Sequence, residues 1–410
     1  MREMEHNIAV EDERDLGRLK VWAETVHKHG AALYAQINHP GRQTYGHLTP
    51  KPVAPSAIPV SNFHPLISMN PPTALTTPQI QETIARYIKT AQTFHKAGFD
   101  GIELHAAHGY LISQFLNPRT NQRTEDQYGG SLENRARFLV EIVEGIKRVT
   151  PSEFSIGVKL NSCDFGRRRQ QESNEAVAVG GGGGGGGENK GEEGKDVVDE
   201  SLEEAVKVAV MLEGLGVDFI EISGGSYESF AAGLLDGKGV PDSPGDKRSK
   251  TPTASTSPAP GTSTRTQKRE AHFAVFAERI SRALKTTKVV LTGGFVTAAA
   301  MAESLRPPSS NNDDGVHIDM VGLGRTVCQE PDLPNFILSG SVTGAIRLPK
   351  TPGGFFDDVF ICGGNIRRMA NGKAPAVSLG GMAASFHHYA YAMDYSKAVA
   401  HRVKTLFCSP

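Results

Sequence analysis

The sequence predicts an α/β fold built on parallel strands. Helical patterns alternate with short apolar runs, and these runs are continuous rather than interrupted by polar residues, as is typical of parallel strands covered on both faces. Polar residues or glycines follow nearly every run, which favours a (β/α)₈ barrel over a doubly wound sheet, because barrels place their chemistry at the carboxyl ends of the strands. Strands are predicted over residues 31–37, 101–104, 154–160, 217–222, 288–291 and 318–321.

Helix signals separate these strands. Thr77-Pro78 places proline at the start of one helix, where its missing N–H costs nothing. Ser131 begins another helix, and Ser201-Leu-Glu-Glu204 matches a capping box. Residues 111–116 are interpreted as an apolar turn. Helices are predicted over residues 12–29, from 77 to 97, from 131, from 201, over 273–284 and from 297.

Three segments interrupt the alternation. Residues 44–76 are rich in proline and serine and are predicted to form a long loop. Residues 166–195 contain the unbroken glycine run 180–187, and residues 237–268 are rich in Pro, Ser, Thr and Lys; both are predicted to be disordered inserts. We therefore predict one barrel domain over 1–345, followed by a helical extension over 346–410 that packs on the barrel.

Composition narrows the class of protein. The formal net charge is −1 over 410 residues, which gives no reason to expect binding to nucleic acid or to an anionic membrane. Four cysteines without a CxxC pair fit a reducing compartment. No signal peptide and no membrane-spanning run is expected, so the predicted location is cytoplasmic.

The chemically richest stretch follows the predicted strand 101–104. His105, His108 and Tyr110 stand together at its carboxyl end. The two histidines could be metal ligands, acid–base groups, hydrogen-bond donors or structural residues; because no third ligand stands nearby, no metal site is predicted. Tyr110 could be a general acid or a packing tyrosine.

Other strand ends suggest an anion site. Glycines let a backbone approach a phosphate, and arginine adds a charged contact; ordinary tight turns are the alternative. The residues are Ser223, Gly224, Gly225, Thr292, Gly293, Gly294, Gly322, Gly324 and Arg325. Lys159 ends another strand and would need an anionic partner unless it reaches solvent. Gln36 offers an amide suited to an imide or amide edge.

Three longer motifs resemble the old yellow enzyme family. They are QINHPGRQ over 36–43, HAAHGYLISQFL over 105–116 and NQRTEDQYGGSLENR over 121–135, within a resemblance that runs from about residue 17 to 345. The family consists of FMN-dependent NAD(P)H oxidoreductases and ene-reductases on (β/α)₈ barrels. The resemblance implies an enzyme that passes hydride from NAD(P)H through FMN to a small molecule with an activated C=C bond or carbonyl.

The resemblance also implies residue roles. Gln36 would bind the flavin pyrimidine edge and Lys159 the N1/O2 region. The glycine strand ends would hold the ribityl chain and phosphate, with Arg325 on the phosphate. His105 and His108 would bind the substrate oxygen, and Tyr110 would protonate the substrate carbon. A homo-oligomer is a further expectation.

Members of the family begin with two strands upstream of the first helix seen here. We therefore expect an N-terminally truncated barrel that lacks its first two strands, has residues 31–37 and 318–321 as its edges, and binds FMN weakly. The alternatives are a truncated, catalytically impaired flavoprotein paralogue acting at most as a binding module, and a non-redox phosphate-binding barrel such as an aldolase.

Overall fold

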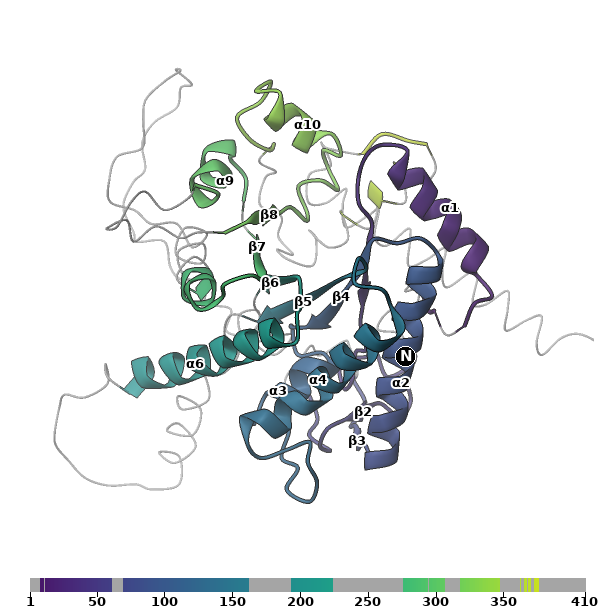
Figure 1. The fold of residues 1–410 in the computed structure, drawn as a ribbon, viewed down its shortest axis with the longest axis vertical. Helices are drawn as coiled ribbons and strands as arrows, with labels where there is room; N and C mark the ends of the chain where they lie inside the picture. Colours follow the sequence, from purple (N-terminus) through teal and green to yellow (C-terminus); the bar gives the residue numbers. More distant parts are fainter. Residues whose placement is uncertain are drawn as a thin grey trace, which may run out of the picture. The chain divides into compact units, whose positions relative to one another are not determined.

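Figure 1 shows the computed structural model of the chain. The structure describes residues 8–10, 12–60, 69–161, 193–223, 276–293, 295–306 and 318–346, with the short pieces 362, 365–366, 368–369 and 372–375. The predicted insert 237–268, all but residues 193–195 of the insert 166–195, and most of the predicted extension 346–410 lie outside these residues. Two compact units divide the chain, Met1–Leu291 with Ser310–Met320 and Thr292–Ser309 with Val321–Pro410.

The main sheet follows chain order. Its strands are arranged β1-β4-β5-β6-β7-β8, and each registered pair from β1 to β7 is parallel. A doubly wound sheet reverses its order at a switch point, and the described sheet does not, so that alternative is wrong. Each predicted strand overlaps one observed strand, and β1 and β8 are the edges of the described sheet as expected. The bounds are β1 Tyr34–Ile37, β4 Gly101–Ala106, β5 Ser155–Asn161, β6 Phe219–Ser223, β7 Lys288–Thr292 and β8 Met320–Gly322.

The two faces of this sheet differ in chemistry. In β1, Ala35 and Ile37 are buried whereas Tyr34 and Gln36 are exposed. The strands β4, β5 and β6 alternate in side-chain polarity, with Ile, Val and Leu on one face and polar residues, glycines and Phe219 on the other, although every residue of β4 is buried. The prediction of continuous apolar strands is therefore wrong, because the second face carries the candidate site rather than a second apolar layer. The residues of that second face include Gln36, Glu103, His105, Gly157, Lys159, Phe219, Glu221 and Ser223.

Amphipathic helices cover the apolar face. In Figure 1, α2, α4 and α6 lie side by side against it. Gly145 of α4 permits this contact, because a side-chain carbon there would overlap Ile88 of α2. The bounds in the first unit are α1 Leu16–His27, α2 Thr77–Lys96, α3 Leu111–Leu116, α4 Leu132–Val149 and α6 Glu193–Gly214; the second unit contains α9 Ala298–Ser304 and α10 Leu333–Leu338. Residues 276–283 are also helical.

Capping explains where several helices begin. Ser131 accepts a hydrogen bond from the Asn134 N–H and confirms the predicted start of α4. Thr76, rather than Thr77, caps α2 in a reciprocal capping box with Gln79. The capping box predicted at Ser201 is wrong: α6 begins at Glu193, since residues 195–200 contain no proline or glycine to stop it.

Within the first unit, one short helix and one small sheet were not predicted. Residues 111–116, interpreted as a turn, form the helix α3. Within the predicted loop 44–76, β2 (Val53–Ala54) and β3 (Thr73–Ala74) pair in parallel as a separate small sheet. Neither element has enough residues to show a sequence period, so only tertiary contacts reveal them.

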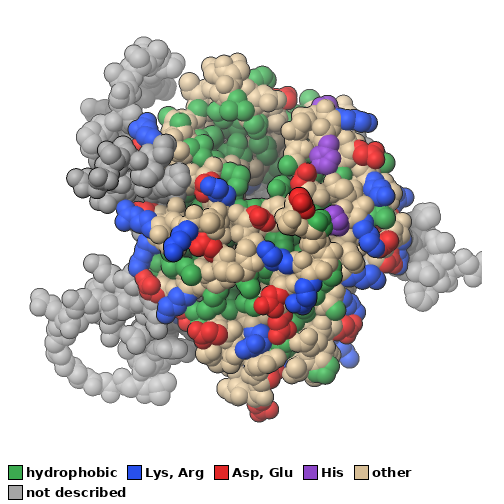
Figure 2. Space-filling view, viewed as in Figure 1, with side chains coloured by type: hydrophobic (Ala, Val, Ile, Leu, Met, Phe, Trp, Pro, Cys, Tyr) green, Lys and Arg blue, Asp and Glu red, His purple; other side chains and the backbone are tan. Residues whose placement is uncertain are grey.

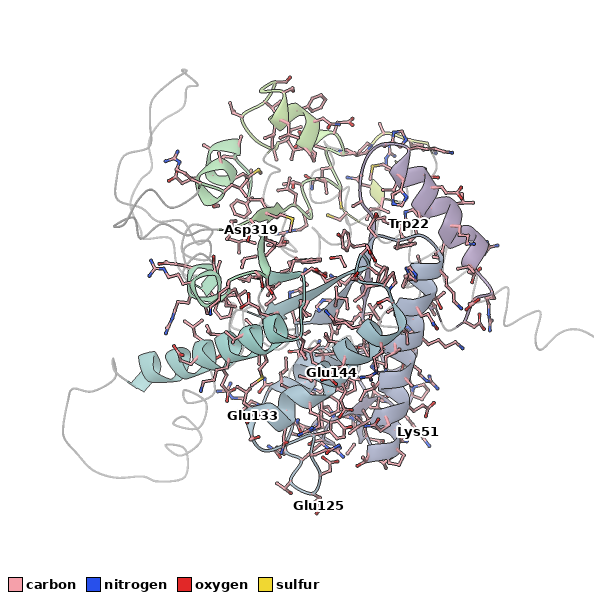
Figure 3. All side chains as sticks on the ribbon, viewed as in Figure 1. Trp22, Lys51, Glu125, Glu133, Glu144 and Asp319 are labelled. Carbon is pink, nitrogen blue, oxygen red and sulfur yellow. The ribbon has the colours of Figure 1, made fainter. Side chains whose placement is uncertain are left out.

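An aspartate repeats just before alternate strands. Asp100, Asp218 and Asp319 precede β4, β6 and β8, and Figure 3 labels Asp319. Each donates its backbone N–H to a residue on the preceding strand or just before it, and its carboxylate accepts the N–H of that same residue. These two bonds fix the register between neighbouring strands. The partners are Leu33, Ile156 and Val289, respectively.

Candidate active site

Three aromatic side chains meet at the carboxyl end of β4. His105 is 5% exposed and Tyr110 is 7% exposed. The ring centroids of His105 and His108 are 4.9 Å apart, those of His105 and Tyr110 are 4.7 Å apart, and those of His108 and Tyr110 are 6.5 Å apart. The residues singled out by the HAAHGY motif therefore form one cluster in the structure.

A tight backbone turn holds this cluster. His108 has φ 58°, the one positive φ outside glycine among the described residues, and Gly109 follows with φ 76°. The His108 N–H donates to Asn161 Oδ1 at 2.9 Å, and Gln43 Nε2 donates to the His108 carbonyl at 2.8 Å. Left-handed backbone at a histidine is costly, so these bonds keep the turn in place. Sequence reasoning missed Gln43 and Asn161, although Gln43 ends the first family-like motif.

Hydrogen bonding assigns a proton to His105. Its Nδ1 accepts the Ala107 N–H at 3.3 Å, which leaves Nε2 as the protonated, donating nitrogen of the neutral ring. Burial, with smaller contributions from the neighbouring His108 ring and the Lys159 ammonium, holds the pKa of His105 well below its usual value. The cluster therefore presents a neutral N–H donor rather than an imidazolium at pH 7.

His108 is also neutral. Burial, with a smaller contribution from Lys159, lowers its pKa to about 4, and Glu221 opposes this effect. Its Nε2 lies 2.9 Å from Ser223 Oγ at the end of β6. Ser223, expected to serve a phosphate site, thus contacts the histidine cluster in the described structure.

A second polar group lies across the same face of the sheet. Gln36 Nε2 donates to Glu103 Oε2 at 2.5 Å, and Lys159 Nζ lies 2.6 Å from Glu221 Oε1. The Lys159 and Glu221 side chains are only 12% and 13% exposed. Lys159 therefore has the anionic partner that its burial requires, and the alternative in which it reaches solvent is wrong. Sequence reasoning missed both glutamates, which look like ordinary strand residues.

The glycine-containing strand ends at residues 292–294 and 322–325 belong to the second unit. Gly293, after β7, has φ 134°, a backbone conformation that favours glycine. A side chain at Gly322, at the end of β8, would overlap Thr292, so that position also requires glycine. Arg325 is exposed beside Gly324. Gly224, Gly225 and Gly294 lie outside the described residues. The phosphate site remains a prediction.

Charges around these elements are mixed. Figure 2 shows lysine, arginine and carboxylate side chains interspersed over the face in view, as the net charge of −1 suggests. Among the described residues, no helix is both long and apolar enough to cross a membrane. Within the same part of the chain, no group of three or more His, Cys, Asp or Glu side chains could hold a metal ion.

Asn121 and Arg123 of the third motif, 121–135, donate hydrogen bonds to backbone carbonyls of neighbouring segments. Asn121 Nδ2 donates to the carbonyls of Phe115 and Tyr128, both at 2.7 Å. Arg123 donates to the carbonyls of Pro55 and Leu75, which join the small β2–β3 sheet to this loop. Asn121 and Arg123 therefore hold backbone segments of the fold in place.

Comparison with known proteins points to one family. The NADH:flavin oxidoreductase / NADH oxidase family matches residues 2–180. The NADH-dependent flavin oxidoreductase nadA of Aspergillus parasiticus is 32% identical over 324 residues, which cover 79% of this chain and 58% of nadA. The chain thus spans less than two thirds of that relative. The similarly described iccE of Talaromyces variabilis is 30% identical over 345 residues, covering 81% of this chain and 69% of iccE.

Solved structures agree on the fold. Morphinone reductase in complex with tetrahydroNAD superposes with a TM-score of 0.55 at 23% identity, covering 84% of this chain and 76% of that one. A 2-naphthoyl-CoA reductase complex gives a TM-score of 0.54 at 25% identity, covering 80% of this chain and 41% of the reductase. The parallel sheet in chain order, the histidine cluster and the similarity to these relatives agree. The chain belongs to the NADH:flavin oxidoreductase / NADH oxidase family, the old yellow enzyme family.

Proposed function

We propose that the protein is an FMN-dependent oxidoreductase that passes hydride from NAD(P)H to an activated alkene, such as an enone, or to a related acceptor. The observation that carries this proposal is the cluster of His105, His108 and Tyr110 beside Lys159, which is in register with His105 on the neighbouring strand. Relatives described as NADH-dependent flavin oxidoreductases support it.

The residues of the first unit fit a flavin ring. Gln36 is exposed, and its Nε2 is held by Glu103, so its carbonyl oxygen is turned away from Glu103 and available to an imide N–H. Lys159 lies on the same face as a cation. Gln36 and Lys159 would hold the ring, and Arg325 with the Thr292 and Gly322 turns would hold the phosphate. When bound, FMN supplies the hydride chemistry that no side chain can.

His105 and His108 would bind and polarise the acceptor. Because both rings are neutral, they donate hydrogen bonds to a substrate oxygen without placing a full positive charge there. Donors aimed at an oxygen that gains negative charge during the reaction stabilise its transition state. Tyr110, 4.7 Å from His105 between ring centroids, would deliver the proton to the substrate carbon.

The remaining structural expectations are also proposals. The parallel sheet would belong to a (β/α)₈ barrel of the FMN-linked type. The barrel would occupy residues 1–345, with 346–410 packed on it. A cytoplasmic location and a homo-oligomer would complete the description.

The test uses the purified 410-residue chain with FMN. Anaerobic addition of NADH or NADPH should bleach the flavin absorbance, and 2-cyclohexenone should restore it. Flavin that binds but is not bleached by either nucleotide would support the impaired-paralogue alternative. A protein that binds inorganic phosphate but no flavin would support the non-redox barrel.

A further inference from the structure

Two buried glutamates link the residues that would hold the flavin. Glu103 is 6% exposed and accepts a hydrogen bond from Gln36. Glu221 pairs with Lys159. Glu221, on the other side of β5, is near enough to raise the pKa of the Glu103 carboxyl group, so the two carboxyl groups lie within reach of each other. Four side chains from four adjacent strands therefore form one continuous chain of polar contacts.

A hydrogen bond between the Glu103 and Glu221 carboxyl groups requires a proton on one of them. An ionised carboxylate has only acceptor oxygens, so two carboxyl groups hydrogen-bond to each other only when one of them is protonated. With one proton the pair carries a single negative charge, which the Lys159 ammonium balances. Two ionised carboxylates at this depth would leave one buried negative charge without a cation among these four side chains.

The contacts with Glu103 and Glu221 also orient the side chains of Gln36 and Lys159. An amide side chain can turn by 180° with little change in shape, and the Glu103 acceptor fixes the Gln36 amide with its N–H₂ inward. Glu221 holds the Lys159 ammonium at 2.6 Å and so limits its rotamers. We propose that Glu103 and Glu221 are positioning residues that share one proton and hold Gln36 and Lys159 in the orientation that binds the flavin ring, a role that rests on the proposed function.

This arrangement predicts how flavin affinity depends on pH. Burial, together with the neighbouring Glu221, raises the pKa of Glu103 to about 8. Its proton is therefore present at pH 7 and lost as the pH rises through 8. The other groups facing the pair are Gln36, Lys159, His105 and His108, and both histidines are already neutral at pH 7. If only the protonated pair binds flavin, affinity should fall about tenfold between pH 7 and pH 9.

The experiment titrates riboflavin into the full chain and follows flavin fluorescence from pH 7 to pH 9. Riboflavin avoids the phosphate charge of FMN. Wild type should show the tenfold fall, whereas Glu103→Gln should be insensitive to pH, since glutamine can accept from Gln36 and donate to Glu221 but cannot lose a proton. Glu153→Gln, at an exposed position before β5, is the matched control and should follow wild type.

Infrared spectroscopy of the flavin-free protein tests the proton separately. Wild type should show the carbonyl band of a buried protonated carboxyl group at pH 7 that disappears by pH 9.5, and Glu103→Gln should lack it. Flavin binding with a flat wild-type pH profile, or absence of the band, would overturn the proposal while leaving the proposed function intact. A clear band without flavin binding at any pH would instead overturn the proposed function and, with it, the positioning role.

Discussion

Replacing Arg135 with alanine should destabilise the protein strongly. Its guanidinium donates to the Leu116 carbonyl at the end of α3, to the Gly130 carbonyl before α4, and to Glu204 of α6, at 2.8, 2.8 and 2.6 Å. The Arg135 side chain is 7% exposed and that of Glu204 is 30% exposed. One side chain thus joins three elements behind the histidine cluster.

The expected loss of unfolding free energy follows from these contacts. Removing one partner of a buried ion pair costs about 3–5 kcal/mol of unfolding free energy, and the two carbonyls would also lose a charged donor. Glu204→Gln keeps an acceptor for Arg135 and both carbonyl bonds, so we expect a cost of about 1–2 kcal/mol. Arg148→Ala is the matched control on the same helix, because its side chain is 68% exposed and its pair with Glu144, labelled in Figure 3, spans 3.9 Å; such pairs contribute about 0–1 kcal/mol.

Urea unfolding measures these differences. The sequence contains one tryptophan, Trp22 on α1, whose ring packs edge-on against Phe99 at 5.7 Å, so its fluorescence reports unfolding of the first unit. Far-UV circular dichroism provides a second probe. An Arg135→Ala cost within about 1 kcal/mol of that of Arg148→Ala would refute the view that this arginine holds the three elements together.

Four further outcomes test the site and the fold. Tyr110→Phe should leave flavin reduction by NAD(P)H unchanged and slow enone reduction by about 10²-fold or more; stopped-flow traces with equal losses in both half-reactions would instead indicate a packing role. Phenols should give a long-wavelength charge-transfer band with the oxidised flavin, and an unchanged band in the His105→Ala, His108→Ala double variant would remove the histidines from the oxygen site. Arg325→Ala should weaken FMN binding more than riboflavin binding by fluorescence titration, and equal losses would argue against a phosphate contact. Asp218→Ala should lower the urea midpoint by more than Asp218→Asn, because asparagine still accepts the Ile156 N–H at 2.7 Å; an unfolding cost below about 1 kcal/mol for the alanine variant would show that this bond contributes little.

The sequence alone determined the order of the main elements and the cluster of His105, His108 and Tyr110. Local signals were sufficient for these: apolar runs located the six strands of the main sheet, Ser131 capped α4 as predicted, and the residues of the HAAHGY motif, His105, His108 and Tyr110, lie together. Such features depend on residues close in sequence, where backbone propensity and side-chain spacing are visible. The repeated aspartates before β4, β6 and β8 are equally local, but they show their purpose only once their strand partners are known.

Tertiary structure decided what each polar residue on the sheet contacts. Glu103, Glu221 and Lys159 come from different strands, separated by dozens of residues, and no sequence pattern indicates that they meet. The same is true of Asn161, which fixes the His108 turn from the next strand. Burial raises the pKa of Glu103 and lowers the pKa values of His105 and His108, and burial is a property of the assembled sheet and helices rather than of any short segment. The sequence therefore identified the candidate groups for the chemistry, whereas the packing of adjacent strands decided which partners they contact.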